Sequence, residues 1–204
     1  MANVYAPFGL RPFGHRDGSA PTMGLERRWM LSSDASVVGT GDVVYNSSTL
    51  VGYVTLATSG TVGVGGVFAG CEYYSPTVNR RVWSAYFPGT VSSSSPVTAY
   101  LITDPEMTFI AQGSTQSVIG SSAIGLNIGI STNNGNPDTT TGISRCSLLS
   151  SFPTGNSSLP FRIVDVYSNF APPGVNGTDN TVPGAILVVA PHNWDRNTLT
   201  GATT

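Results

Sequence analysis

The side chains that could act as nucleophiles or transfer protons are few and scattered. The two histidines are His15, near the start of the chain, and His192, near its end. A Ser/His/Asp site built on His192 would use Asp195 or Asp165 to orient the imidazole. Serine is so frequent here that a serine close to a histidine is expected by chance. No convergent group of titratable residues stands out, so the sequence favours a protein that is not an enzyme.

The sequence also lacks recognisable motifs for binding a metal or a cofactor. Cys71, Cys146 and the two histidines lack the spacing of zinc ligands. The acidic turn at Asp104 to Glu106 offers calcium only two neighbouring carboxylates. Without lysine there is neither a phosphate-binding Gly-Lys-Ser/Thr loop nor a Schiff-base nucleophile. We therefore expect no catalytic residue, no metal and no cofactor, and we interpret both cysteines as buried free thiols.

The charge of the chain argues against nucleic-acid and membrane partners. The formal net charge is -2, whereas affinity for phosphate backbones requires clustered Lys and Arg. Arg27-Arg28 and Arg80-Arg81 are the only basic pairs, and each is interpreted as a solvated turn or an intersubunit contact. The longest apolar run, Ala185 to Ala190, is far shorter than a membrane span, and no signal peptide is expected.

Short apolar runs with period-2 alternation, separated by Gly, Pro and Asn, predict an all-β fold. We expect a single β-sandwich or barrel domain, jelly-roll-like, over residues 21–204, with no helix of convincing length. The region from Met23 to Leu31 fits a short strand or a helical turn equally well. The predicted strands are Asp42–Asn46, Leu50–Thr58, Val64–Ser75, Arg81–Phe87, Val97–Thr103, Met107–Gln112, Ala123–Ser131, Ile143–Leu149, Phe161–Tyr167 and Ala185–Ala190.

A hairpin over residues 63–89 is expected to organise this fold. Its first strand has glycines at interior positions, which predicts a bulge, a corner or a close backbone approach. In the second strand, every second side chain points to the same face, which places Trp83, Ala85 and Phe87 together. We expect that face, with Trp83, to be buried.

Residues 1–20 are expected to form an extended N-terminal arm outside the domain. The arm shows no strand or helix period, and Pro and Gly hold its backbone extended. Phe8, Leu10 and Phe13 are apolar and need a surface to bury against, which is the core of their own chain, a sister subunit or a partner. Arg11, between two of these anchors, could reach a carboxylate or carbonyl on the partner. These four residues are the predicted interaction site.

The order of several motifs resembles a family of tailed-bacteriophage virion proteins, the capsid decoration or cement proteins. The resemblance runs over nearly the whole chain and involves no catalytic motif. It rests on Pro7-Phe8-Gly9-Leu10-Arg11-Pro12, Gly41-Asp42-Val43-Val44, Gly66-Val67-Phe68-Ala69-Gly70-Cys71, Phe87-Pro88-Gly89, Asp104-Pro105-Glu106-Met107-Thr108-Phe109, Ile119-Gly120, Gly125-Leu126-Asn127, Leu159-Pro160-Phe161-Arg162-Ile163 and Val188-Val189-Ala190-Pro191-His192-Asn193.

This resemblance implies a structural protein that is made in the host cytoplasm and bound to the outer capsid surface of the virion. Its implied partners are the major capsid protein and further copies of itself, with a trimer favoured over a dimer. The alternative is a host-facing virion or tail module that binds cell-surface glycans. In that case the polar loops at residues 131–142 and 170–184 would form the binding surface.

Overall fold

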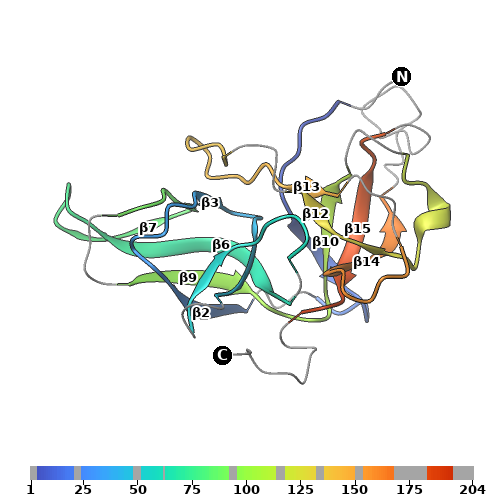
Figure 1. Ribbon diagram of the computed structural model, residues 1–204, viewed down its shortest axis with the longest axis horizontal. Coiled ribbons are helices and arrows are strands. Elements are labelled where there is room, and N and C mark those ends of the chain that lie inside the picture. The colour runs from blue at the N-terminus through green and yellow to red at the C-terminus, as the bar shows by residue number, and fades with distance from the viewer. Residues whose placement is uncertain are drawn as a thin grey trace.

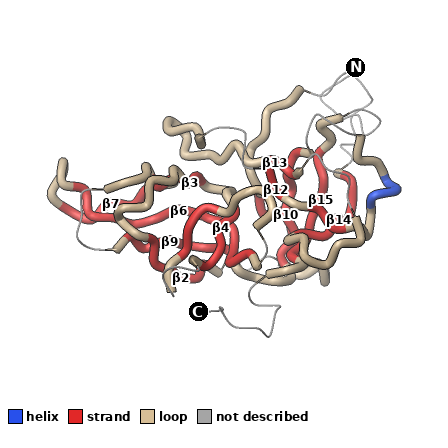
Figure 2. The backbone as a smooth tube through the Cα atoms, viewed as in Figure 1, coloured by secondary structure: helices blue, strands red, loops and turns tan. Residues whose placement is uncertain are grey.

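The computed structural model describes residues 4–20, 24–47, 52–61, 63–91, 96–113, 118–131, 136–149, 154–167 and 183–194. Within these ranges the chain consists of antiparallel strands and loops, arranged as two groups of strands along the long axis of the molecule (Figure 1). The one helical element of the described residues is a 3-10 turn, η1, at Ser121–Ala123 (Figure 2). The all-β prediction is therefore confirmed.

The first group of strands contains a five-stranded sheet in the order β1-β10-β15-β14-β11. A two-stranded sheet, β12 with β13, belongs to the same end of the molecule (Figure 1). The bounds of these strands are β1 Arg11–His15, β10 Met107–Gln112, β11 Asn127–Ile128, β12 Ile130–Ser131, β13 Ser147–Leu148, β14 Phe161–Val166 and β15 Ile186–Pro191.

The second group is a six-stranded sheet in the order β2-β9-β6-β4-β5, with β7 paired to the outer half of β6. A bridge between Trp29 and Tyr53 brings the β5 edge back to β2, so the sheet curls toward closure. A short pair, β3 with β8, lies beside it. The bounds are β2 Leu25–Met30, β3 Val38–Gly39, β4 Val43–Asn46, β5 Val54–Leu56, β6 Val64–Ser75, β7 Arg80–Ser84, β8 Tyr86–Phe87 and β9 Val97–Ile102.

The two sheets share a hydrophobic core. Its larger cluster contains Val43 and Val67 from the six-stranded sheet together with Phe109, Phe161 and Trp194 from the other end of the molecule. The Trp194 ring packs on Phe161 and Phe109, with centroids 5.7 and 6.0 Å away. A second cluster, which includes Met30, Phe68 and Leu101, fills the inside of the curled sheet.

The long hairpin strand is central, as the sequence indicated. β6 pairs with β4, β9 and β7, and its bounds match the predicted strand. The expected irregularity is present as a register shift between Phe68 and Gly70. The region around Met23 to Leu31, which sequence reasoning could not assign, contains strand β2. Both cysteines are buried and free, and burial raises the pKa of Cys71 to about 12.

The expected burial of Trp83 is wrong, because its side chain is 61% exposed. The predicted strand from Arg81 to Phe87 is interrupted by a bend at Ala85, so two short strands with different partners replace it. Period-2 alternation does not continue through a bend. Phe87 in β8 is therefore buried against the core, whereas Trp83 in β7 faces outward.

The prediction that residues 1–20 form an extended arm outside the domain is wrong in part. Arg11–His15 form β1, which pairs antiparallel with β10, and a register shift between Pro12 and Gly14 interrupts the ladder. Local alternation is hidden by this bulge and by the Pro and Gly residues around it. Residues 11–15 thus belong to a sheet of their own chain, and Leu10 beside them lies in the core of that chain.

Asp42, a buried acidic residue, joins three segments of the chain. The side chain of Asp42 accepts hydrogen bonds from the Gly39 amide, at 2.7 Å, and from the Ser144 hydroxyl. The Asp42 carbonyl accepts from the Phe68 amide at 2.8 Å. Ser144 in turn accepts from the Cys146 amide at 2.9 Å. Through its carboxylate and its backbone carbonyl, Asp42 therefore holds the β3–β4 corner, β6 and residues 144–146 together.

The same junction receives the N-terminal segment. The amide of Gly9 donates to the Cys146 carbonyl at 3.1 Å, and the amide of Leu10 donates to the Gly41 carbonyl at 2.9 Å. Gly9 has a φ of +73°, and a Cβ there would lie 2.7 Å from the Cβ of Ser144. Only glycine fits this position without displacing Ser144.

The junction predicts an unusual pH dependence. Burial raises the pKa of Asp42 above its ordinary value of 3.8, and the two hydrogen bonds oppose the rise only in part. For a carboxyl with a raised folded pKa, the stabilising contribution is complete below the ordinary pKa and is lost as pH rises through the folded pKa. The stability difference between the wild type and Asp42→Asn should therefore be larger at about pH 4 than at about pH 7.

Urea unfolding of both proteins at each pH measures this difference. Asp42→Asn should cost about 1 to 3 kcal/mol, since an amide cannot accept from both Gly39 and Ser144. Ser144→Ala is the companion variant that keeps the carboxyl. A wild-type advantage that is equal at both pH values, or larger at neutral pH, would contradict this account of Asp42.

Candidate interaction surfaces

The described residues do not assemble the Ser/His/Asp site that the sequence left open on His192. Asp165 pairs with Val188, four residues before His192 along β15, which corresponds to about 13 Å of strand. Asp195 lies outside the described residues. Within the described ranges, no group of three His, Cys, Asp or Glu side chains could hold a metal ion.

A different histidine does meet a serine and an aspartate. In His15, Nδ1 lies 2.9 Å from the Ser19 hydroxyl, and Nε2 lies 3.0 Å from a carboxylate oxygen of Asp104. The Asp104 contact has ion-pair length, but Nε2 has no partner with hydrogen-bond geometry. The Ser19 amide, which could stabilise an oxyanion, already donates to Asp17 at 2.8 Å. This cluster ties the end of β1 to the β9–β10 turn and lacks the parts of a nucleophilic site.

The structure separates the four predicted interaction residues into two roles. Leu10 is 1% exposed and packs in the core of its own chain, so it is an anchor and not a contact for a partner. Phe8 is half-buried, and the Arg11 guanidinium lies over its ring at 5.1 Å. Phe13 is 53% exposed and forms a T-shaped contact with the Tyr167 ring, with the ring centroids 5.8 Å apart. Phe8, Arg11 and Phe13 therefore remain available to a partner.

The residues before Phe8 extend this surface. Gln112 on β10 holds them: its Oε1 accepts from the Ala6 amide at 2.9 Å, and its Nε2 donates to the Val4 carbonyl at 2.8 Å. The Tyr5 hydroxyl lies 3.1 Å from the Ser147 hydroxyl. Val4 and Tyr5 nevertheless keep their side chains exposed. We call this set the N-terminal surface: Val4, Tyr5, Phe8, Arg11 and Phe13.

A second surface lies on the outer side of the six-stranded sheet. The register pairs Trp29 of β2 with Thr98 of β9, Thr98 with Glu72 of β6, and Glu72 with Trp83 of β7. Side chains paired in register share a face of the sheet, so these four residues form one row. The two tryptophans are separated by three strand spacings of about 4.8 Å, or about 14 Å in all.

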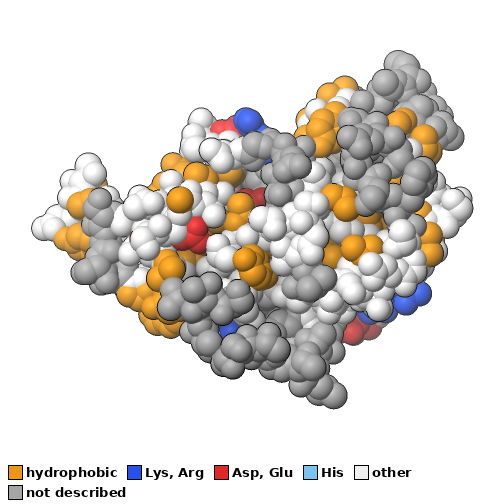
Figure 3. Space-filling view, in the orientation of Figure 1, with side chains coloured by type: hydrophobic (Ala, Val, Ile, Leu, Met, Phe, Trp, Pro, Cys, Tyr) orange, Lys and Arg blue, Asp and Glu red, His pale blue; other side chains and the backbone are white. Residues whose placement is uncertain are grey.

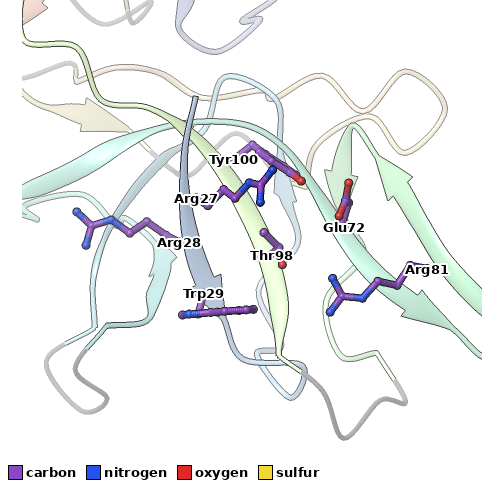
Figure 4. Close-up of a pocket in the computed structure, with 7 residues that line it drawn as sticks. All are labelled: Arg27, Arg28, Trp29, Glu72, Arg81, Thr98 and Tyr100. Carbon is purple, nitrogen blue, oxygen red and sulfur yellow. The ribbon is translucent and has the colours of Figure 1, made fainter. Parts of the chain in front are cut away.

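The neighbouring row adds charge and another ring. Arg27 pairs with Tyr100, and its guanidinium lies 5.8 Å from the centre of that ring. A surface depression with a volume of about 250 Å³ is lined by Arg27, Arg28, Trp29, Glu72, Arg81, Thr98 and Tyr100 (Figure 4). Trp83 lies outside this lining, next to Glu72 at the end of the row. We call this surface the tryptophan face: Arg27, Trp29, Glu72, Arg81, Trp83, Thr98 and Tyr100.

The arginines of this depression differ in their partners. Arg28 also lines it but points away from the other labelled side chains in Figure 4 and is paired with Glu26 at 2.7 Å. Arg81 extends toward Thr98 in the same view. Among the described residues, no carboxylate lies within ion-pair distance of Arg27 or Arg81. Their guanidinium charges are therefore available to a ligand.

Two polar residues, Tyr100 and Glu72, lie next to each other at the floor of the depression. The Tyr100 hydroxyl points toward the Glu72 carboxylate in Figure 4. Partial burial and the neighbouring Glu72 raise the pKa of Tyr100, while the charges of Arg27 and Arg81 act in the opposite direction. Tyr100 is thus a neutral hydroxyl at physiological pH, and Glu72 is placed as an acceptor at the centre of the tryptophan face.

A glycine sets the position of Trp83. Gly70 has a φ of +140°, and a Cβ on it would lie 2.8 Å from the Trp83 ring. The indole therefore covers the bare backbone of Gly70, and its other face stays open to solvent. This packing explains why a mostly exposed tryptophan has a defined position.

Sequence reasoning missed the tryptophan face. It treated the two basic pairs as separate solvated turns or contacts, whereas the sheet brings Arg27 and Arg81 to the same depression. A signal was present, because in a strand over Leu25–Met30 the side chains of Leu25, Arg27 and Trp29 share one face. The shared face was not recognised because the sequence fits a short strand and a helical turn equally well over Met23 to Leu31.

Comparison of the chain with models of protein families, with curated proteins and with solved structures found no match. Within the described residues, no helix is both long enough and apolar enough to cross a bilayer.

Because Leu10 is buried in the core and Phe13 is mostly exposed, replacing each with alanine should change the stability of the fold by very different amounts. Leu10→Ala should destabilise the fold by about 2 to 5 kcal/mol, because it opens a cavity in the shared core. Phe13→Ala should stay within about 0.5 kcal/mol of wild type, because its ring is mostly in solvent. Chemical denaturation of the two variants side by side provides the measurement. Equal losses in both would place Phe13 in the core and contradict the surface described here.

Proposed function

We propose that this chain is a structural virion protein that decorates the outer surface of a phage capsid. In this proposal it binds the major capsid protein and sister copies, as a trimer, and strengthens contacts between capsid subunits. The order of motifs along the chain supports the proposal through its resemblance to decoration proteins. The structural observation that carries it is the N-terminal surface, where apolar side chains and an arginine are held outward by hydrogen bonds to the core.

The N-terminal surface suits attachment because it is preorganised. Leu10 and the amides of Gly9 and Leu10 anchor the segment, so little backbone entropy is lost when a partner binds. Burial of Val4 and Phe13 would contribute about 1.5 to 3 kcal/mol each before ordering costs. An oligomer that presents several such surfaces gains further from multivalency, since each additional contact is intramolecular.

The composition of the chain also suits a permanent assembly. It has no lysine, and charged residues make up only 10%. On the side seen in Figure 3, few charged side chains reach the surface. Arginine and uncharged polar groups are easier to desolvate at an interface than lysine, whose ammonium is strongly hydrated. A protein that spends its working life packed on a shell can carry such a surface.

For the alternative function, glycan binding, the sequence predicts a binding surface in the loops at residues 131–142 and 170–184. Residues 132–135 and 168–182 lie outside the described residues, so that location stays a prediction. The exposed aromatic rings that a sugar site requires are found instead on the tryptophan face.

Binding to undecorated capsids tests the proposal. Wild-type protein should co-sediment with capsids and raise the temperature at which they rupture, because a ligand that binds only the intact shell stabilises it by mass action. The double variant Val4→Asp with Phe13→Asp should bind at least about tenfold more weakly, since each aspartate would be buried without a partner. Ile124→Asp, at an exposed apolar residue outside the N-terminal surface, is the matched control.

Two outcomes would count against the proposal in different ways. If wild-type protein neither binds capsids nor changes their rupture temperature, the decoration role is wrong. If it binds and the double variant binds equally well, the decoration role stands and the N-terminal surface is not the contact.

A further inference from the structure

The tryptophan face has features that attachment to a shell does not require. Trp29 is 46% exposed and Trp83 is 61% exposed, and both lie in one row across four strands. Large rings usually contribute by burial, so two open indoles at this spacing indicate a ligand that packs on ring faces. The C–H groups of a sugar ring carry slight positive charge and can pack on the negative face of an indole.

The floor between the tryptophans is polar. Thr98, Glu72 and Tyr100 supply hydroxyl and carboxylate oxygens to the depression, and the Tyr100 hydroxyl points toward Glu72. An apolar peptide would desolvate these groups without replacing their bonds to water, which is costly. A ligand rich in hydroxyl groups can donate to Glu72 and exchange hydrogen bonds with Thr98. The combination of aromatic walls and a polar floor therefore fits a carbohydrate.

The charges around the floor narrow the class of carbohydrate. Arg27 approaches from the β2 side and Arg81 from the β7 side, and neither has an ion-pair partner among the described residues. A guanidinium binds a carboxylate through two parallel hydrogen bonds. Glu72, lying between them, repels an anionic group placed directly over it and can instead accept hydrogen bonds from neutral hydroxyl groups, which the sugars within a single-stranded DNA chain lack. Neutral hydroxyls over Glu72 with carboxylates at the arginines satisfy all three side chains.

We propose that the tryptophan face is a binding site for a glycan that carries carboxylate groups, such as a chain containing uronic or sialic acids. The sugar rings pack on Trp29 and Trp83, hydroxyl groups donate to Glu72, and carboxylates pair with Arg27 and Arg81. This site lies on a different sheet from the N-terminal surface. It does not depend on the proposed attachment to a capsid.

Tryptophan fluorescence of the full chain gives a direct readout. The chain has three tryptophans, of which Trp29 and Trp83 are exposed and Trp194 is buried. Titration with oligogalacturonate and with a sialic-acid oligomer should change the emission for at least one of the two probes. The double variant Trp29→Ala with Trp83→Ala retains Trp194 and should lose the response. Calorimetric titration of the same variant should show at least about tenfold weaker binding.

Matched ligands and variants separate charge from stacking. The methyl ester of oligogalacturonate keeps the sugar backbone and removes the carboxylate charge, so wild type should bind it at least about tenfold more weakly than the acid. Arg27→Gln with Arg81→Gln should bind acid and ester about equally. Val78→Ala, an exposed apolar residue in the β6–β7 turn and outside the depression, should behave as wild type. Unchanged unfolding midpoints would show that the variants are folded.

Several results would overturn the proposal. Absence of binding by wild type to both acidic probes would remove it, and so would equal binding by wild type and the double tryptophan variant. Tighter binding to oligothymidylate than to either glycan would replace it with a single-stranded nucleic-acid site. Equal binding of acid and ester by wild type would overturn the role of the arginines. None of these results bears on the capsid-binding experiment.

Discussion

The buried carboxylate of Asp42 is the interaction on which the rest of the structure depends. It has hydrogen-bond partners at Gly39 and Ser144, and the backbone of the same residue is bonded to Phe68. The adjoining Gly41 and Cys146 receive the amides of the N-terminal segment. Leaving such a group without partners in a low-dielectric interior would cost more than its hydrogen bonds gain. Asp42, together with the backbone bonds of Gly41 and Cys146, therefore specifies one arrangement of the N-terminal segment, the β3–β4 corner, β6 and residues 144–146.

Both candidate surfaces follow from this arrangement. The junction holds Leu10 in the shared core, and Leu10 in turn sets where Phe8, Arg11 and Phe13 can lie. Through Phe68 it also positions β6, the strand that carries Glu72 and the glycine beneath Trp83. One surface is thus presented by the five-stranded sheet and the other by the six-stranded sheet. Unpaired strand edges promote aggregation, and charged residues often prevent it. Most strands of this chain are paired within the molecule, so it can expose both surfaces although it has few charges.

Sequence reasoning recovered what is local and missed what depends on distant pairing. The bounds of β6 and β10 were predicted because alternation and turn residues lie within a few positions of each other. β1 was missed because its partner, β10, lies more than ninety residues away and a bulge breaks the pattern. Trp83 was misplaced because the bend at Ala85 reverses the alternation, and no residue in that stretch marks it. The convergence of Arg27 and Arg81 follows from strand order, which a single sequence does not reveal.

A cryo-electron microscopy reconstruction of phage particles from cells that make this protein tests the proposed decoration role most directly. The account predicts density for this all-β chain on the outside of the head, over junctions between capsid subunits. Phe13 and Val4 should face the shell, and Trp29 and Trp83 should face the solvent. Density confined to the tail, or a head-bound chain with the tryptophan face buried against the shell and the N-terminal surface in solvent, would contradict it.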